Sequence, residues 1–369
     1  RRKTDNFLRR IKPRIPHPER IATMMSMLKA SVLVNAALLV AFFALKYDRY
    51  SSKQQQGLGS GLATKPVQSR VRGLLHAIGR HSKSLNRRPT RVFDAIPGNH
   101  DGPGSLENIR LTHPSGAEAT IYKFGAAATS YKDASGTEWL AVRPDAKFDG
   151  TKAISGGIPH CFPQFGPGEL PQHGFARDSM WDLVSAEGST AVFELTDNEK
   201  TRAIWDYPFK ATYTVDLADD QLKTKLEVLN TGDKPFDFTG ALHSYFDVSN
   251  INDVKICGPF KGQNIIDRMQ SPPATITADS DDIKITTETD QIVPGVVGAV
   301  KIEDAGKAKS LMIKSTQGWK DTVLWNPYGN ENMGYEKFVC VEAAAAMEPV
   351  SVAPGQSWVA DMDLIPATL

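Results

Sequence analysis

The sequence predicts an all-β fold for most of the chain. Beyond Leu106, apolar and polar residues alternate with a period of two, which is typical of strands with one buried and one solvated face. The clearest segments, 209–217 and 222–228, flank the turn Ala218-Asp-Asp220 and predict an antiparallel hairpin. Segments 119–124 and 191–195 predict further strands, whereas convincing long helices and repeats of about 20 to 50 residues are absent. We therefore expect a large antiparallel sandwich or barrel.

Composition narrows the class of protein. The chain has 369 residues, 41% of them apolar, which suits one large globular domain with an extension. Its net charge of +1 does not favour binding of nucleic acid or another bulk polyanion. Three cysteines cannot form an even disulfide framework. Because Cys161 and Cys340 lie in apolar segments, we expect both to be buried free thiols.

The first hundred residues differ from the rest. Residues 1–23 form a basic arm, with eight Lys and Arg residues against two acidic ones, and residues 24–46 predict a single transmembrane helix. Lys29 interrupts the apolar run near one end, where it could reach the interface. A buried core helix and a cleaved signal peptide are the alternatives. The basic bias weakly favours the N-terminus on the cytoplasm-like side.

Residues 47–104 predict a basic linker. Apolar residues recur at helical spacing near 71–78 among basic side chains, which predicts an amphipathic helix on a membrane or partner surface, or else a partly disordered tether. The arginine-rich start and free cysteines suit an organellar protein. We expect a single-pass protein of an organelle membrane, with the plastid thylakoid slightly favoured over the mitochondrial inner membrane.

A loop rich in glycine and proline is the most informative motif. It reads Gly156-Gly-Ile-Pro-His-Cys-Phe-Pro-Gln-Phe-Gly166, followed by Leu170-Pro-Gln-His-Gly-Phe-Ala-Arg177. This mixture fits neither a helical nor a strand period. It predicts a rigid loop that presents His173 and Arg177 at a pocket, although an ordinary connection between strands would have the same composition.

Further motifs follow in a fixed order: Ala241-Leu-His-Ser-Tyr-Phe246, Glu288-Thr-Asp290, Trp325-Asn-Pro327, Phe338-Val-Cys-Val-Glu342 and Pro354-Gly-Gln-Ser-Trp358. With the loop, they resemble the glucose-6-phosphate 1-epimerases of the aldose 1-epimerase family, from about Leu106 to Ile365. The resemblance implies a galactose-mutarotase-like β-supersandwich over residues 105–369. It also implies exchange of the α and β anomers of a hexose or hexose 6-phosphate, without metal or other cofactor, by one acid and one base.

Two of the motifs carry the implied acid and base. The resemblance makes His243 the general acid and Glu342 the general base. From the residues alone, a histidine on an apolar strand is more often a core residue than a catalyst. Glu342 ends an otherwise apolar segment, and burial there would raise its pKa and suit it to act as a base near neutrality.

Four more residues are candidates for sugar binding. By resemblance, His173 holds the ring oxygen or an adjacent hydroxyl, Asp290 binds a sugar hydroxyl, and Arg177 lies at the phosphate end of the pocket. The residues alone leave Asp290 as an exposed turn aspartate and Arg177 as a partner of a carboxylate such as Asp178. Trp325 either walls the pocket or belongs to the core.

The chain departs from the family pattern at the ligand-binding edges. Ser155 stands where the family has the phosphate-binding arginine of Arg-Gly-Gly-Ile-Pro, and a neutral donor binds phosphate less strongly than a charged one. The residues after Asp290 also differ from the family pattern, and the segment between Trp325 and Phe338 is shorter than in the family. We expect weakened phosphate affinity with the acid and base retained. Three hypotheses remain: an active membrane-tethered mutarotase, a structural subunit of an organellar membrane complex, and a sugar-binding module without turnover.

Overall fold

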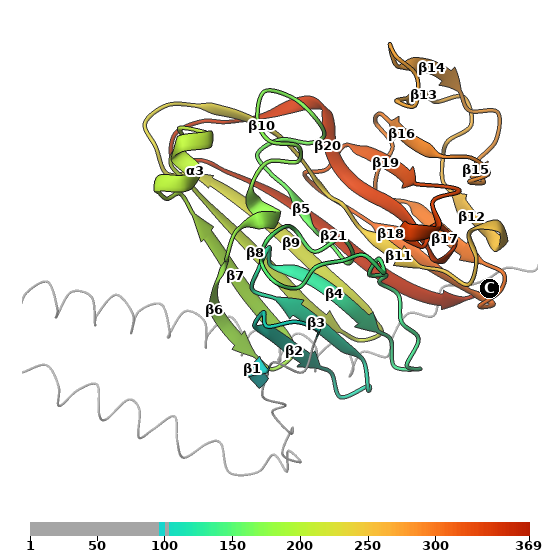
Figure 1. The fold of residues 1–369 in the computed structure, drawn as a ribbon, viewed down its shortest axis with the longest axis horizontal. Coiled ribbons are helices and arrows are strands. Elements are labelled where there is room, and N and C mark those ends of the chain that lie inside the picture. Colours follow the sequence, from blue (N-terminus) through green and yellow to red (C-terminus); the bar gives the residue numbers. More distant parts are fainter. Residues whose placement is uncertain (1–95, 100–102) are drawn as a thin grey trace, which may run out of the picture. The chain divides into compact units, whose positions relative to one another are not determined.

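The computed structural model describes residues 96–99 and 103–369, which form three antiparallel sheets (Figure 1). The predicted basic arm 1–23, the transmembrane helix 24–46 and nearly all of the linker 47–104 lie outside the described residues. Within the described part, no helix is both long enough and apolar enough to span a bilayer. The prediction of an all-β domain is confirmed, and these residues form one compact unit.

The largest sheet of the described part has nine strands, and it contains the hairpin that the sequence predicted. Phe209–Ala218 and Gln221–Asn230 pair along their whole length around the turn, and their side chains alternate between buried and solvated positions. In spatial order, the strands are β15 (Asp282–Ile283), β12 (Val254–Cys257), β17 (Val300–Asp304), β18 (Lys309–Lys314), β21 (Ser357–Thr368), β9 (Gln221–Asn230), β8 (Phe209–Ala218), β7 (Thr190–Thr196) and β6 (Asp182–Glu187).

The second sheet carries most of the candidate functional residues. Its order among the described strands is β14 (Ala274–Thr277), β13 (Asn264–Asp267), β16 (Thr289–Val293), β19 (Asp321–Asn326), β20 (Phe338–Val352), β10 (Phe236–Leu242) and β5 (His160–Cys161), with β11 (Tyr245–Asp247) also paired to β20. The hairpin β13–β14 projects at one end of the domain (Figure 1).

A smaller sheet completes the domain. It consists of β1 (Ile96–Asn99), β2 (Asn108–Thr112), β3 (Glu118–Tyr122) and β4 (Ala127–Lys132). The one α-helix of the described residues, α3 (Glu199–Ile204), begins at Asn198, whose side chain caps the backbone N–H groups of Lys200 and Thr201. Short 3₁₀ turns are η1 (Ala176–Asp178), η2 (Ile251–Asp253), η3 (Glu331–Met333) and η4 (Tyr335–Lys337).

The main core lies between the two large sheets. Val339, Val341 and Ala343 on β20 belong to the same buried apolar cluster as Val215 on β8 and Leu364 on β21. Because successive side chains of a strand point to opposite faces, the even-numbered residues of this part of β20 face away from that core. This second face of the sheet holds the candidate active site.

Candidate active site

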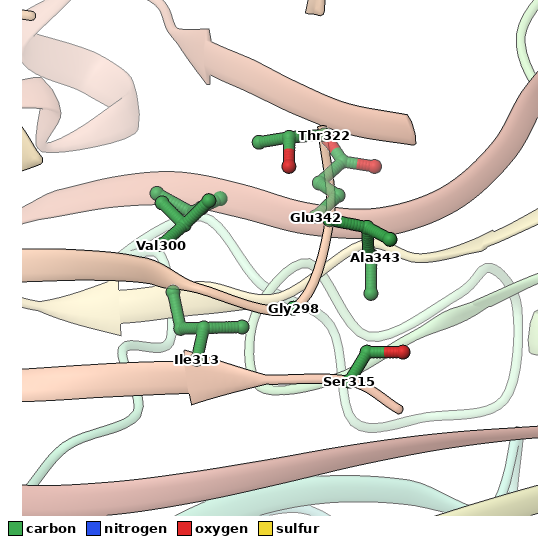
Figure 2. A pocket seen from close by; sticks show the side chains of 9 residues that line it. Gly298, Val300, Ile313, Ser315, Thr322, Glu342 and Ala343 are labelled. Carbon is green, nitrogen blue, oxygen red and sulfur yellow. The ribbon is translucent and has the colours of Figure 1, made fainter. Parts of the chain in front are cut away.

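Glu342 lies on the face of β20 that points away from the main core. Figure 2 shows Glu342 and Ala343 pointing to opposite sides of the strand. Cys340 and Ala344 flank Glu342 on its own face, and Val323 is its partner on β19. The side chain is 1% exposed, so its carboxyl group is almost fully withdrawn from water. The apolar strand thus places a carboxyl group among small and apolar strand neighbours.

His243 lies beside Glu342, in the short break between β10 and β11 and not within a strand as the sequence suggested. Its backbone N–H donates to the carbonyl of Pro159 at 2.9 Å, which ties it to the glycine-rich loop. Its ring stacks on Tyr245, with centroids 4.9 Å apart, and meets Trp325 edge to face at 5.7 Å. Nδ1 of His243 is 3.3 Å from Oε1 of Glu342.

The two residues form a buried titratable pair with unused hydrogen-bonding capacity. Nδ1 of His243 and Oε2 of Glu342 have no hydrogen-bond partner among the described residues. Buried polar atoms are normally paired, so these two atoms have capacity to hydrogen-bond a ligand. Burial raises the pKa of Glu342 well above its ordinary value, and burial, with the positive charge of Arg177, lowers the pKa of His243. Between the lowered pKa of His243 and the raised pKa of Glu342, the pair therefore holds one proton.

His173 belongs to the glycine-rich loop and lies beside His243. Its ring centroid is 5.4 Å from that of His243. Nδ1 accepts a hydrogen bond from the backbone N–H of Gly166 at 3.2 Å and lies 3.0 Å from Sγ of Cys161. Burial keeps the Cys161 thiol protonated by raising its pKa, so the thiol also donates to Nδ1.

These contacts fix the tautomer of His173. Since Nδ1 accepts, the proton of the neutral ring must be on Nε2, which is then free to donate to an oxygen in the site. Burial, together with the charges of Arg177 and Arg268, lowers the pKa of His173 to about 3. The ring is therefore neutral at physiological pH and acts as a hydrogen-bond donor of fixed orientation.

The loop that carries His173 packs closely on its neighbours at glycine positions. A Cβ atom on Gly174 would lie 2.2 Å from the carbonyl oxygen of Phe162, and one on Gly157 would lie 2.0 Å from that of Ala128. Both glycines have positive φ angles, which residues with side chains rarely adopt. His173 itself has φ +66°, a conformation held by the contacts of its ring. The loop brings His173 beside His243, and its rigid presentation of His173 and Arg177 at a pocket stays a prediction.

Asp290 and Trp325 are placed by strand register. Asp290 on β16 pairs with Trp325 on β19, Trp325 with Cys340 on β20, and Cys340 with Tyr245 on β11. This cross-strand row lies beside Glu342. Trp325 is half-buried and packs with His243, Tyr245 and Phe338. The alternative of an exposed turn for Asp290 is wrong, because it lies half-buried within a strand.

Two arginines accompany these groups. Nη2 of Arg177 donates to the carbonyl of Gln172 at 3.0 Å, whereas its Nε is 3.9 Å from Asp178, too far for a hydrogen bond. Arg268 lies 3.7 Å from Asp290 and over the ring of Phe165. The positive charges of both arginines oppose the burial that raises the pKa of Glu342, which places them around the pair of His243 and Glu342.

Sequence reasoning missed several members of this site. Arg268, Cys161 and Tyr245 were not assigned roles, although the last two are part of quoted motifs. Tyr245 follows His243 by two residues, and that spacing could have indicated a ring stacked on the histidine. Arg268 lies in no recognised motif, and only the pairing of β13 with β16 brings it to Asp290.

Comparison with known proteins identifies the family of the chain. The aldose 1-epimerase family matches residues 107–364. A putative glucose-6-phosphate 1-epimerase of Cenchrus ciliaris is 31% identical over 277 residues, covering 69% of this chain and 83% of that protein. One of the same description from Escherichia coli K12 is 31% identical over 262 residues, covering 67% and 86%.

Solved structures give the same result at the level of the fold. A putative mutarotase from Salmonella typhimurium has a TM-score of 0.65 and 26% identity, covering 80% of this chain and 100% of that one. A Synechocystis protein also has a TM-score of 0.65, at 19% identity, and covers 72% and 98%. The chain therefore belongs to the aldose 1-epimerase family.

Proposed function

We propose that this domain interconverts the α and β anomers of a hexose or hexose 6-phosphate by opening and closing the sugar ring. The observation that carries the proposal is the buried pair of His243 and Glu342, whose Nδ1 and Oε1 atoms are 3.3 Å apart. One carboxyl group and one imidazole within reach of the same sugar supply the acid and the base that the reaction needs.

The single proton of the pair accounts for the chemistry. The raised pKa of Glu342 and the lowered pKa of His243 favour this proton on Glu342. The reactive arrangement is the one in which the proton has moved to His243, so that Glu342 is a carboxylate and takes the proton of the anomeric hydroxyl. His243 gives its proton to the ring oxygen as the bond between this oxygen and the anomeric carbon breaks, which leaves an open-chain aldehyde. Rotation about the adjacent carbon–carbon bond and the reverse proton transfers close the ring as the other anomer. The sugar loses and regains one proton, and the pair returns to its starting state.

The surrounding residues suit the remaining oxygens and faces of the sugar. Nε2–H of His173 is a neutral donor for the ring oxygen or an adjacent hydroxyl. Asp290 accepts from a hydroxyl, while Trp325 provides an aromatic wall. These roles for His173, Asp290 and Trp325, and that of Arg177 toward a phosphate, follow from the family resemblance and from their positions around the pair.

Anomer exchange measured by saturation-transfer NMR tests the proposal. Purified protein should accelerate exchange of glucose 6-phosphate or glucose, and Glu342→Gln should lower the rate by at least about 100-fold, as expected for loss of a general base. Glu348→Gln is the matched control, because Glu348 lies on the same strand and its side chain is 82% exposed. Wild-type protein without rate enhancement, or a Glu342→Gln variant of wild-type activity, would refute the assignment.

We also propose that residues 24–46 anchor the domain to an organelle membrane. The support is the apolar run of that segment and the basic arm before it. The full-length chain should remain in the membrane fraction after alkaline carbonate extraction and should leave it when residues 1–46 are removed. Release of the intact chain by carbonate would contradict the proposal. Co-purification with a large membrane complex, together with no anomer exchange, would instead favour the structural-subunit hypothesis.

A further inference from the structure

A cavity of about 320 Å³ lies next to the catalytic pair. Its lining includes Ala141, Arg143, Asp247, Lys337 and Phe338. Phe338 also packs on Tyr245, with ring centroids 5.4 Å apart, and Tyr245 stacks on His243. The rings of Phe338 and Tyr245 thus lie in series between this cavity and His243. By contrast, the small space in Figure 2 is lined by the core residues Val300, Ile313 and Val341 as well as by Glu342, and its volume of about 10 Å³ is only about that of one water molecule.

The cationic groups of the larger cavity are held in place and only partly neutralised. The side chain of Arg143 is 12% exposed, and it donates from Nε and Nη2 to the two carboxylate oxygens of Asp145 at 2.9 and 2.6 Å. Those two bonds fix the plane of the guanidinium group. Lys337 donates to the carbonyl of Ser249 at 2.8 Å and has no carboxylate within 4.0 Å among the described residues. Asp247 is paired with Lys307 at 2.7 Å, so the group keeps a net positive charge.

Strand register connects Arg143 to Ser155. The backbone N–H of Arg143 donates to the carbonyl of Ser155 at 3.0 Å, and the neighbouring residues Val142 and Gly156 form an antiparallel bridge. Side chains of directly opposed residues in such a pair share a face and begin about 5 Å apart. Arg143 therefore lies directly opposite Ser155, the position at which the family resemblance implies a phosphate-binding arginine.

We propose that Arg143 and Lys337 form the binding subsite for the phosphate group of a hexose phosphate. This assignment rests on the proposed mutarotase function. The guanidinium of Arg143 supplies the positive charge that Ser155 lacks, from the opposite strand of the same backbone pair. A planar guanidinium matches the geometry of phosphate oxygens, and the exposed lysine adds a second charge at the rim.

Kinetics with two sugars test the subsite. The ratio of kcat/KM for glucose 6-phosphate to that for glucose should fall at least about tenfold in Arg143→Met and in Lys337→Met, the loss expected for one charge-assisted hydrogen bond. The fall should appear mainly in KM for glucose 6-phosphate. Lys320→Met is the matched control, because the side chain of Lys320 is 58% exposed at another part of the domain. Arg143→Met leaves the carboxylate of Asp145 without its partner and could prevent folding. Lys337 is exposed, so Lys337→Met still tests the subsite if the Arg143→Met variant does not fold.

Binding of inorganic phosphate, measured by isothermal titration calorimetry on the full chain, separates this proposal from the proposed activity. Phosphate should bind wild-type protein and the Lys320→Met control alike, and at least about tenfold more weakly to Lys337→Met. Such a pattern without anomer exchange of either sugar would refute the activity and still support the anion subsite. Unchanged phosphate binding and an unchanged sugar ratio in Lys337→Met and Arg143→Met, with loss confined to Arg177→Met, would overturn the subsite.

Discussion

Replacing Glu342 with glutamine should stabilise the fold at neutral pH while it removes the proposed base. Burial raises the pKa of Glu342 well above 4.5, so the folded chain keeps a proton that the unfolded chain has already lost. When the folded state binds more protons than the unfolded state, the free energy of unfolding decreases as pH rises. For Glu342 this decrease begins near the unfolded pKa and continues until pH passes the folded pKa. A glutamine at this position never ionises, so the variant does not undergo this decrease in the free energy of unfolding.

The size of the effect follows from the burial of the carboxyl group. Each pKa unit between the folded and unfolded chain corresponds to about 1.4 kcal/mol, and an imperfectly paired buried group costs about 1–3 kcal/mol. We therefore expect Glu342→Gln to be about 1–3 kcal/mol more stable than wild type at pH 7.5 and nearly equal at pH 4. At about 2–4 °C per kcal/mol for a domain of this size, Tm should rise by roughly 2–12 °C at the higher pH.

Urea unfolding followed by circular dichroism at pH 4, 5.5 and 7.5 measures the difference. His243 acts in the opposite direction, because burial lowers its pKa and the fold loses stability as pH falls below about 6.5. That contribution is present in both proteins and largely cancels in their difference. Glu348→Gln should leave stability unchanged at every pH, since its side chain is 82% exposed. A pH-independent difference, or a Glu342→Gln protein that is less stable at pH 7.5, would refute the reasoning.

Three further predictions concern the loop and the core. Gly157→Ala should destabilise the domain by at least about 2 kcal/mol in urea unfolding, because the new Cβ would lie 2.0 Å from the carbonyl oxygen of Ala128 at a positive φ angle; a neutral effect would show that the loop is not rigid. Cys161→Ala should lower kcat about two- to tenfold, because His173 loses one hydrogen bond. In this variant ¹⁵N NMR should show a mixture of His173 tautomers, and an unchanged spectrum would contradict the positioning role of Cys161. Leu364→Ala, fully buried between the large sheets, should cost about 2–5 kcal/mol of unfolding free energy, and a loss below about 1 kcal/mol would argue against tight packing there.

Local patterns in the sequence predicted much of the fold. The alternation in 209–217 and 222–228 depends only on which residues are apolar, and the paired strands β8 and β9 follow it residue by residue. Glu342 was recognisable because a carboxylate in an apolar strand has few structural uses. His243 was recognisable only through its motif, since the sequence around it also suits a core residue. The catalytic roles of these residues stay predictions until exchange is measured.

Features that depend on strand register could not be predicted. The approach of Arg268 to Asp290 requires the pairing of β13 with β16, and no local pattern specifies which strands become neighbours. The contact between Cys161 and His173 needs the loop to fold back on itself across twelve residues. Cys161 and Cys340 were expected to be buried free thiols, and this is confirmed, but the hydrogen bond that orients His173 was not foreseen.

The serine at position 155 shows why register also matters for inferring function. If each position is compared separately, the serine at position 155 removes the phosphate-binding charge. An anion, however, binds wherever a positive charge lies in space, and an antiparallel strand pair brings two distant sequence positions close together. Arg143, twelve residues earlier, is the partner of Ser155 across that pair and reaches a cavity beside the catalytic residues. Loss of the charge at Ser155 is therefore not sufficient reason to conclude that the domain has given up phosphorylated sugars, and the Lys337→Met and Arg143→Met variants decide between relocation of the charge and its loss.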